Sequence, residues 1–225
     1  SNEMSYLKIV LKNRKLMILY FITYFMLCFI DTKTFGVIYM QDDMIFRLLN
    51  HQVFLIFLVP IFVLSVINEK FLCIQKDYMV IYSINEKKNI IKIFNIVLGT
   101  ELLFYILGQI FFQGINYFIT GKVYLISIKF NVLTILEILS ASYIVLSILL
   151  LLKKDLFTYI NYYILLMVLL VVNSGYITFP MTIKVLSLLQ HDYIKLLISR
   201  TFLFLLTFFI FKMSLKRYSS KFYGG

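Results

Sequence analysis

Residues 132–152 read VLTILEILSASYIVLSILLLL, and this stretch decides the class of the protein. Glu137 is the one charged residue in it. A helix needs about 20 consecutive, mostly apolar residues to cross a bilayer, so the stretch predicts a membrane-spanning helix. The polar residues Lys153-Lys154-Asp155 follow, and a second apolar run then occupies Leu156–Val172. Together the two runs predict a tight hairpin of membrane helices.

The composition of the whole chain agrees with this class. Of its 225 residues, 61% are hydrophobic and 15% are charged, and the mean hydropathy is +0.91. A soluble domain has about 25% charged residues. We expect an all-α polytopic membrane protein with a single transmembrane domain over residues 1–225, of which 1–3 are a tag remnant before Met4. The six expected spans are Leu16–Ile30, Leu48–Ile67, Ile93–Ile119, Val132–Leu152, Leu156–Val172 and Ile194–Phe211.

The distribution of Lys and Arg predicts the orientation of these spans. With the N-terminus in the cytoplasm, fifteen of the 22 basic residues fall on inside segments, and seven, Arg200 among them, fall on outside segments. Cytoplasmic loops carry an excess of Lys and Arg, so we expect both termini inside. The same rule accounts for the net charge of +11 without a nucleic-acid partner.

The longest expected cytoplasmic loop, residues 68–92, contains a helix and a corner. Apolar residues recur at helical spacing between positions 71 and 82, which predicts an amphipathic helix at the membrane surface. Ser83-Ile84-Asn85-Glu86 is then a capping box that starts a new helix leading into the third span. The corner is either a surface anchor or a docking site for a cytoplasmic partner. The docking interpretation uses Tyr78, Tyr82, Ser83, Asn85, Glu86 and Lys87.

This region also carries a resemblance to a known family. Ile81-Tyr82-Ser83 followed by Lys87-Lys88-Asn89-Ile90-Ile91 is similar to the apolar-Ser-x-x-Lys/Arg-x-x-Ile run that type-2 ATP-binding-cassette (ABC) permeases often carry before the third span. The expected topology, with six spans, both termini inside and a coupling helix between spans two and three, resembles that family over nearly the whole chain. The Glu-rich run of the family is reduced here to Glu69, and its proline near the serine is absent.

The resemblance implies a non-catalytic permease subunit of an exporter of amphipathic or antimicrobial peptides, serving toxin export or self-immunity. A separate ATPase subunit would bind ATP and Mg²⁺ and dock on the corner. A second permease chain, identical or paralogous, would face this one across the path of a peptide or lipid-like cargo. This chain has no G-x-x-x-x-G-K-[ST] motif, so we expect no cofactor in it. The implied location is the plasma membrane of a Gram-positive bacterium, in contact with lipid.

Polar residues inside the expected spans mark a candidate translocation path. Glu101 lies in the third span and Glu137 in the fourth, and an intramembrane carboxylate is costly enough to suggest a function. Each carboxylate either bonds a neighbouring helix or faces the path and contacts a cationic substrate. Gln109, Gln113 and Asn116 share one face of the third span by their spacing. They either bond across helices or line a wet cavity.

Two other functions stay open. A secondary transporter or channel would show internal repeats and helices broken at the midplane, and neither is evident in the sequence. An intramembrane enzyme needs clustered His, Asp, Glu or Cys, but there is no H-E-x-x-H motif, and His51 and His191 stand alone. We therefore expect no catalytic and no metal-binding residues. The outer segment 173–195 is predicted to be re-entrant or interfacial.

Overall fold

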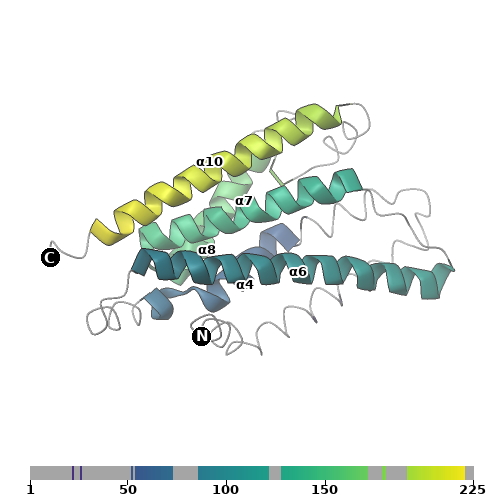
Figure 1. The fold of residues 1–225 in the computed structure, drawn as a ribbon, viewed down its shortest axis with the longest axis horizontal. Helices are drawn as coiled ribbons and strands as arrows, with labels where there is room; N and C mark the ends of the chain where they lie inside the picture. The colour runs from purple at the N-terminus through teal and green to yellow at the C-terminus, as the bar shows by residue number, and fades with distance from the viewer. Residues whose placement is uncertain are drawn as a thin grey trace.

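The computed structural model describes residues 54–72, 86–121, 128–171, 179–180 and 192–220, together with the single positions 22, 26 and 52. The part of the chain that it describes is helical and contains no strand. Figure 1 shows the helices as one elongated bundle. In chain order they are η1 (Phe54–Leu58, one turn of π-helix), α4 (Val59–Val66), α6 (Glu86–Thr120), α7 (Ile128–Leu152), α8 (Asp155–Val171) and α10 (Tyr193–Ser220).

Within these described ranges, four segments are long and apolar enough to cross a membrane. They are Phe54–Leu72, Lys87–Phe111, Ile128–Leu152 and Tyr193–Tyr218. The apolar part of α8, Asp155–Leu169, is shorter. The prediction of an all-helical membrane protein is therefore confirmed. The first expected span, 16–30, lies outside the described residues apart from positions 22 and 26, so the count of six spans stays a prediction.

Contacts near the helix ends give the relative directions of the helices. Lys129 lies over the ring of Tyr193 and Lys153 over the ring of Tyr218, so α7 and α10 run parallel. In α6 the ring of Phe94 packs against Tyr143 of α7 and Phe211 of α10, near the start of α6 and towards the far ends of the other two. Hence α6 runs antiparallel to both, as Figure 1 shows.

The break between α7 and α8 falls where the charged residues predict it. Helix α7 ends at Leu152 and α8 begins at Asp155. Lys153 between them has a φ of 57°, and its N–H donates a hydrogen bond of 2.7 Å to the carbonyl of Leu149. A left-handed residue directly after a helix is a common way to satisfy its last carbonyls. Asp155 in the first turn of α8 complements the positive end of the helix dipole.

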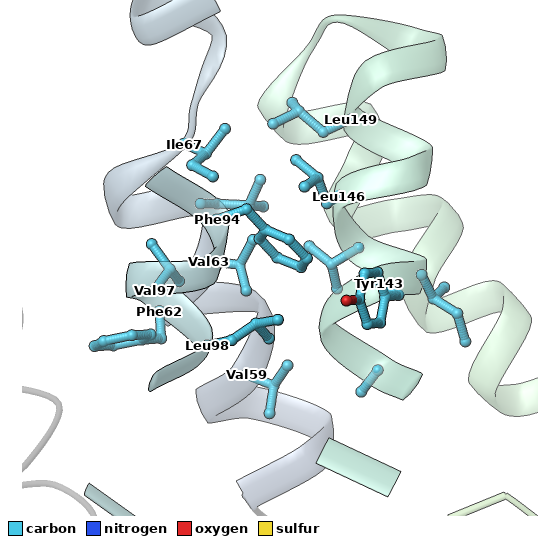
Figure 2. Packing of buried hydrophobic residues seen from close by; sticks show 14 of the residues in the cluster. Val59, Phe62, Val63, Ile67, Phe94, Val97, Leu98, Tyr143, Leu146 and Leu149 are labelled. Atoms are coloured by element: carbon cyan, nitrogen blue, oxygen red, sulfur yellow. The ribbon is translucent and has the colours of Figure 1, made fainter. Parts of the chain in front are cut away.

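The core of the bundle lies between α4, α6 and α7, and Figure 2 shows its centre. Phe94 points from α6 into the space between Val63 of α4 and Leu146 of α7, and all three side chains are at most 1% exposed. In a bilayer the lipid tails are as apolar as these residues, so helices associate through close packing and hydrogen bonds. The interlocked aromatic and branched side chains supply that packing.

Helix α7 is the central element, and its most extensive contact is with α10. Ser140, Ala141, Ser142 and Ser147 are buried on it. Small residues let helix backbones approach closely in a membrane. Three of these residues are serines whose hydroxyls donate to a carbonyl one turn earlier in α7, so they add no unsatisfied donors to the interface.

Basic residues gather at one end of the bundle within the described ranges. This basic end comprises the turn 69–72 after α4, the start of α6, the turn between α7 and α8, and the last turns of α10. Its Lys and Arg residues are Lys70, Lys87, Lys88, Lys92, Lys153, Lys154, Lys212, Lys216 and Arg217. Lys129 and Lys195 lie at the opposite end. The grouping of basic residues on one side is what the positive-inside rule requires, and that rule predicts that the basic end faces the cytoplasm.

Candidate functional site

A fully buried ion pair joins the two most extensively packed helices. Arg200 of α10 places its Nε 2.7 Å from Oε1 of Glu137 in α7, and the two side chains are 1% and 0% exposed. Arg200 follows Tyr193 by about 10 Å and Glu137 follows Ile128 by about 13 Å along their helices, so they meet at similar depth. Water does not solvate charges buried to this degree, so each charge is compensated by the opposite charge of the other side chain.

This geometry differs from the expectation for Arg200. The count of basic residues placed Arg200 on an outside segment, but it lies within α10 and faces α7. For Glu137 the geometry fits the structural alternative, in which the carboxylate bonds a neighbouring helix. The signal in the sequence was a single Arg in one apolar run and a single Glu in another.

A second buried carboxylate joins α6 to α7. Glu101 is 0% exposed and stands close to the middle of the apolar segment Lys87–Phe111. Its Oε2 lies 2.7 Å from Oγ of Ser142, which is also fully buried. Its Oε1 has no hydrogen-bond partner among the described residues. Glu101 therefore faces the interior of the bundle, with one oxygen satisfied and the other not.

A third polar contact satisfies a backbone carbonyl of η1 that has no donor within its own helix. In a π-helix each carbonyl accepts from the N–H five residues later. For Leu55 that residue is Pro60, which has no N–H to donate. The hydroxyl of Tyr162 in α8, itself 0% exposed, donates instead to the Leu55 carbonyl at 2.8 Å. One tyrosine thus satisfies a buried carbonyl on a helix that is distant in sequence.

We expect Tyr162→Phe to lower the free energy of unfolding by about 1–3 kcal/mol, the usual cost of leaving one buried polar group unsatisfied. The ring stays, so packing is preserved. Tyr163→Phe is the matched control, since Tyr163 is only half-buried and the structure gives its hydroxyl no hydrogen bond to a described residue. Denaturation in detergent micelles measures both, and equal losses for the two variants would contradict the assignment.

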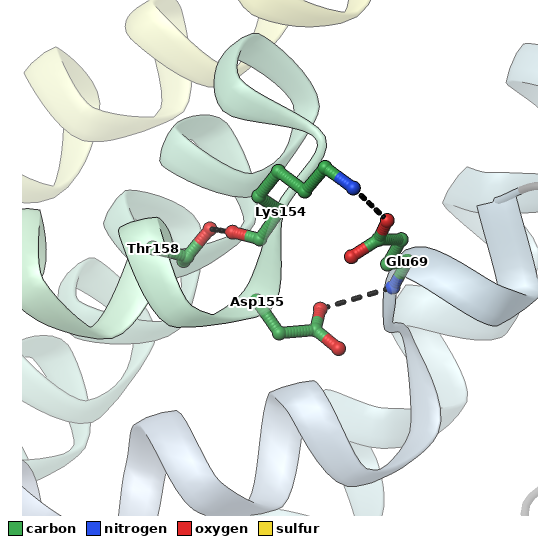
Figure 3. A network of polar contacts seen from close by, with 4 residues as sticks. All are labelled: Glu69, Lys154, Asp155 and Thr158. Atoms are coloured by element: carbon green, nitrogen blue, oxygen red, sulfur yellow. Dashed lines mark hydrogen bonds and ion pairs between the residues drawn. The ribbon is translucent and has the colours of Figure 1, made fainter.

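At the basic end, polar contacts also connect the chain after α4 to the turn between α7 and α8, as Figure 3 shows. The backbone N–H of Glu69 donates to Oδ1 of Asp155 at 2.9 Å, and Nζ of Lys154 pairs with Oε1 of Glu69. Asn68 caps the turn 69–72, because its Oδ1 accepts the N–H of Phe71 at 2.9 Å. The chain that leaves α4 is thereby attached to the turn between α7 and α8.

The residues predicted to dock a partner fall on both sides of a gap in the described ranges. Tyr78, Tyr82, Ser83 and Asn85 lie outside the described residues. Glu86 and Lys87 stand at the start of α6, which continues without a break to Thr120. The predicted run of helix from this corner into an apolar span is confirmed from Glu86 onward. Of the amphipathic helix predicted before it, the structure describes positions 71 and 72 alone, so the coupling helix stays a prediction.

The path residues of α6 divide into two groups. Glu101 is buried against α7, as described above. Gln109, Gln113 and Asn116 lie beyond it in α6, and the helical backbone through Thr120 puts them on one face. The side chain of Gln109 is partly exposed, while those of Gln113 and Asn116 lie outside the described side chains. Their role in a translocation path stays a prediction.

No group of three or more His, Cys, Asp or Glu side chains that could hold a metal ion occurs in the described part of the chain. Comparison of the sequence with protein-family models and with curated proteins, and of the fold with solved structures, finds no match. The interpretation of function therefore rests on the residues and contacts given above.

Proposed function

We propose that this chain is the permease subunit of an ATP-driven exporter of the type-2 ABC kind, which works with a separate ATPase subunit. Its cargo is an amphipathic or antimicrobial peptide, exported as a toxin or in self-immunity. The chain acts as one half of a pair of permeases in the plasma membrane of a bacterium and binds no nucleotide itself.

The attachment of Glu69 to Lys154 and Asp155 is the observation that carries the proposal. A motor subunit needs a cytoplasmic element through which it moves the membrane helices. In the sequence, residues 73–85 lie between that attachment at Glu69 and the start of α6 at Glu86. A displacement of this segment would therefore reach α7 and α8 through the turn, and α6 directly.

Helix α6 is suited to transmit such a displacement. It is continuous over 35 residues, or about 52 Å, which exceeds the roughly 30 Å of a hydrocarbon core. Its first turns contain Glu86, Lys87 and Lys88, and Phe94 two turns later enters the core between α4 and α7. A push on the charged start of α6 would thus move residues in the centre of the bundle.

The proposal predicts that reversal of charge at the corner weakens binding of the ATPase. With the chain purified from its native host, a subunit with a G-x-x-x-x-G-K-[ST] motif should co-purify and hydrolyse ATP. Lys87→Glu and Glu86→Lys should each lower the recovered ATPase activity about tenfold, which corresponds to about 1.4 kcal/mol of binding free energy.

Lys195→Glu is the matched control for this experiment. Lys195, like Lys87, is a lysine near the start of a helix, but it lies at the opposite end of the bundle. It should leave the recovery unchanged. The docking proposal fails if both corner variants recover as much ATPase activity as the wild-type chain, or if Lys195→Glu lowers the recovered activity to the same extent as they do.

A further inference from the structure

Glu101 presents a chemical problem that the proposed transport function does not use. Its side chain is 0% exposed near the middle of an apolar helix, and no described Lys or Arg pairs with it. Within the described ranges the buried cation is Arg200, and it is paired with Glu137. A carboxylate that is neither hydrated nor paired is strongly disfavoured in its charged form.

Among the described residues, α7, α8 and α6 itself contribute polar groups to the part of the bundle that contains Glu101. Helix α7 contributes Ser142 and the Glu137–Arg200 pair that it shares with α10. Helix α8 contributes Tyr162, whose hydroxyl lies within electrostatic range of both carboxylates but donates to the Leu55 carbonyl of η1. One turn on in α6, the hydroxyl of Tyr105 donates to Asn131 at 2.8 Å. Each of these groups has its own partner, so none supplies a counter-charge to Glu101.

The position of Ser142 shows where a proton on the Glu101 carboxyl group can lie. Its Oγ lies 2.7 Å from Oε2 of Glu101 and 2.9 Å from the carbonyl oxygen of Ile138. A hydroxyl has one proton to donate and two lone pairs to accept with. Both distances are satisfied when Ser142 donates to the Ile138 carbonyl and accepts a hydrogen bond from a protonated Oε2. A charged Glu101 would compete with Ile138 for the single hydroxyl proton.

We propose that Glu101 is a proton-binding site in the core of the bundle. It holds a proton on Oε2 while α6 and α7 are packed as in this structure. When the helices separate and water enters, the carboxylic acid loses that proton to water and becomes a carboxylate. Movement of α6 against α7 is thereby linked to the release and uptake of one proton. The inference stands apart from the proposed ATPase partner and applies whatever drives the movement.

A proton fits this site better than a metal cation does. Metal ions that bind oxygen require several ligands at once, six or more for Ca²⁺ and near-octahedral geometry for Mg²⁺. Around Glu101 the described residues offer the Ser142 hydroxyl, while the Tyr162 hydroxyl is already engaged. The two oxygens of one carboxylate and one hydroxyl are sufficient for a proton.

Infrared spectroscopy of the whole protein in micelles of an ester-free detergent at neutral pH tests the proposal, because a protonated carboxylic acid has a carbonyl band that a carboxylate lacks. The wild-type protein should show such a band. Glu101→Gln should abolish it and leave the melting temperature unchanged, since a neutral amide replaces a neutral acid of the same shape. Glu69→Gln, which removes a partly exposed carboxylate paired with Lys154, should leave the band in place.

Ser142→Ala is a second variant that keeps the acid but removes its hydrogen-bond partner. It should shift the frequency of the band without abolishing it, which no loss of folding can imitate. Absence of the band from the wild-type protein would overturn the proposal, and so would its persistence in Glu101→Gln. A band that disappears when NaCl replaces choline chloride at constant pH would also overturn it, because it would show that a metal cation occupies the site.

Discussion

Arg200→Leu is expected to lower the free energy of unfolding by about 3–5 kcal/mol, the cost of breaking a buried ion pair by removing one partner. The reason is that Glu137 would keep a charge at 0% exposure without the guanidinium that now lies 2.7 Å away. The pair also joins α7 to α10, which share the most extensive helix contact in the bundle. Denaturant titration of the protein in detergent micelles, followed by circular dichroism, measures the loss.

The double variant Glu137→Leu/Arg200→Leu distinguishes the effect of leaving one charge unpaired from the effect of losing the individual side chains. Replacement of both charges by apolar side chains is often neutral, so it should recover most of the stability lost in Arg200→Leu. Arg217→Leu, an exposed arginine in the last turn of α10, is the control and should change stability by no more than about 0.5 kcal/mol. A double variant as unstable as the single one would show that the two side chains do not act as a pair.

Phe94→Ala is expected to lower the free energy of unfolding by about 3 kcal/mol or more, through the cavity that the missing ring leaves. Its ring packs edge-on against Tyr143, with 5.2 Å between centroids, and at a tilt against Phe211, with 5.6 Å between centroids, so three helices lose contacts at once. In lipid this loss of close packing is the main term, because transfer of the ring to an apolar solvent gains little. The same denaturant titration measures it.

Phe202→Ala is the matched control, since Phe202 lies on α10 but is 66% exposed on the surface of the bundle. Its ring makes no aromatic contact to a described residue, and its loss should cost less than about 1 kcal/mol. If the two phenylalanine variants were equally stable, the core drawn in Figure 2 would not be the packing centre of the molecule.

The helices were predictable because length and apolarity alone specify a membrane span. Val132–Leu152 and Leu156–Val172 match α7 (Ile128–Leu152) and α8 (Asp155–Val171) to within a few residues, and the charged turn between them fell where expected. The helix from Glu86 onward was expected for a different reason, the sequence signature of a capping box, whose residues 83–85 lie outside the described part of the chain. Local signals of these two kinds need no knowledge of the partner helix.

The polar contacts of the core were not predictable in the same way, because each depends on which helices lie side by side. Glu101 and Glu137 were recognised as costly residues, but Ser142 and Arg200 were not recognised as their partners. The bond from Tyr162 to Leu55 spans 107 positions of sequence. Its one local signal was Pro60, which removes a donor from the preceding turn.

The segment between Glu69 and Glu86 is the part of the chain that we propose contacts a separate ATPase on the cytoplasmic side. The most direct measurement places a photoactivatable cross-linking residue at position 82 or 87 in living cells and identifies the cross-linked protein by mass spectrometry. We predict a cross-link from both positions to a subunit with a G-x-x-x-x-G-K-[ST] motif, and none from position 195. Cross-links from positions 82 and 87 to lipid alone, or labelling of these positions by a membrane-impermeant reagent added outside the cell, would contradict the account.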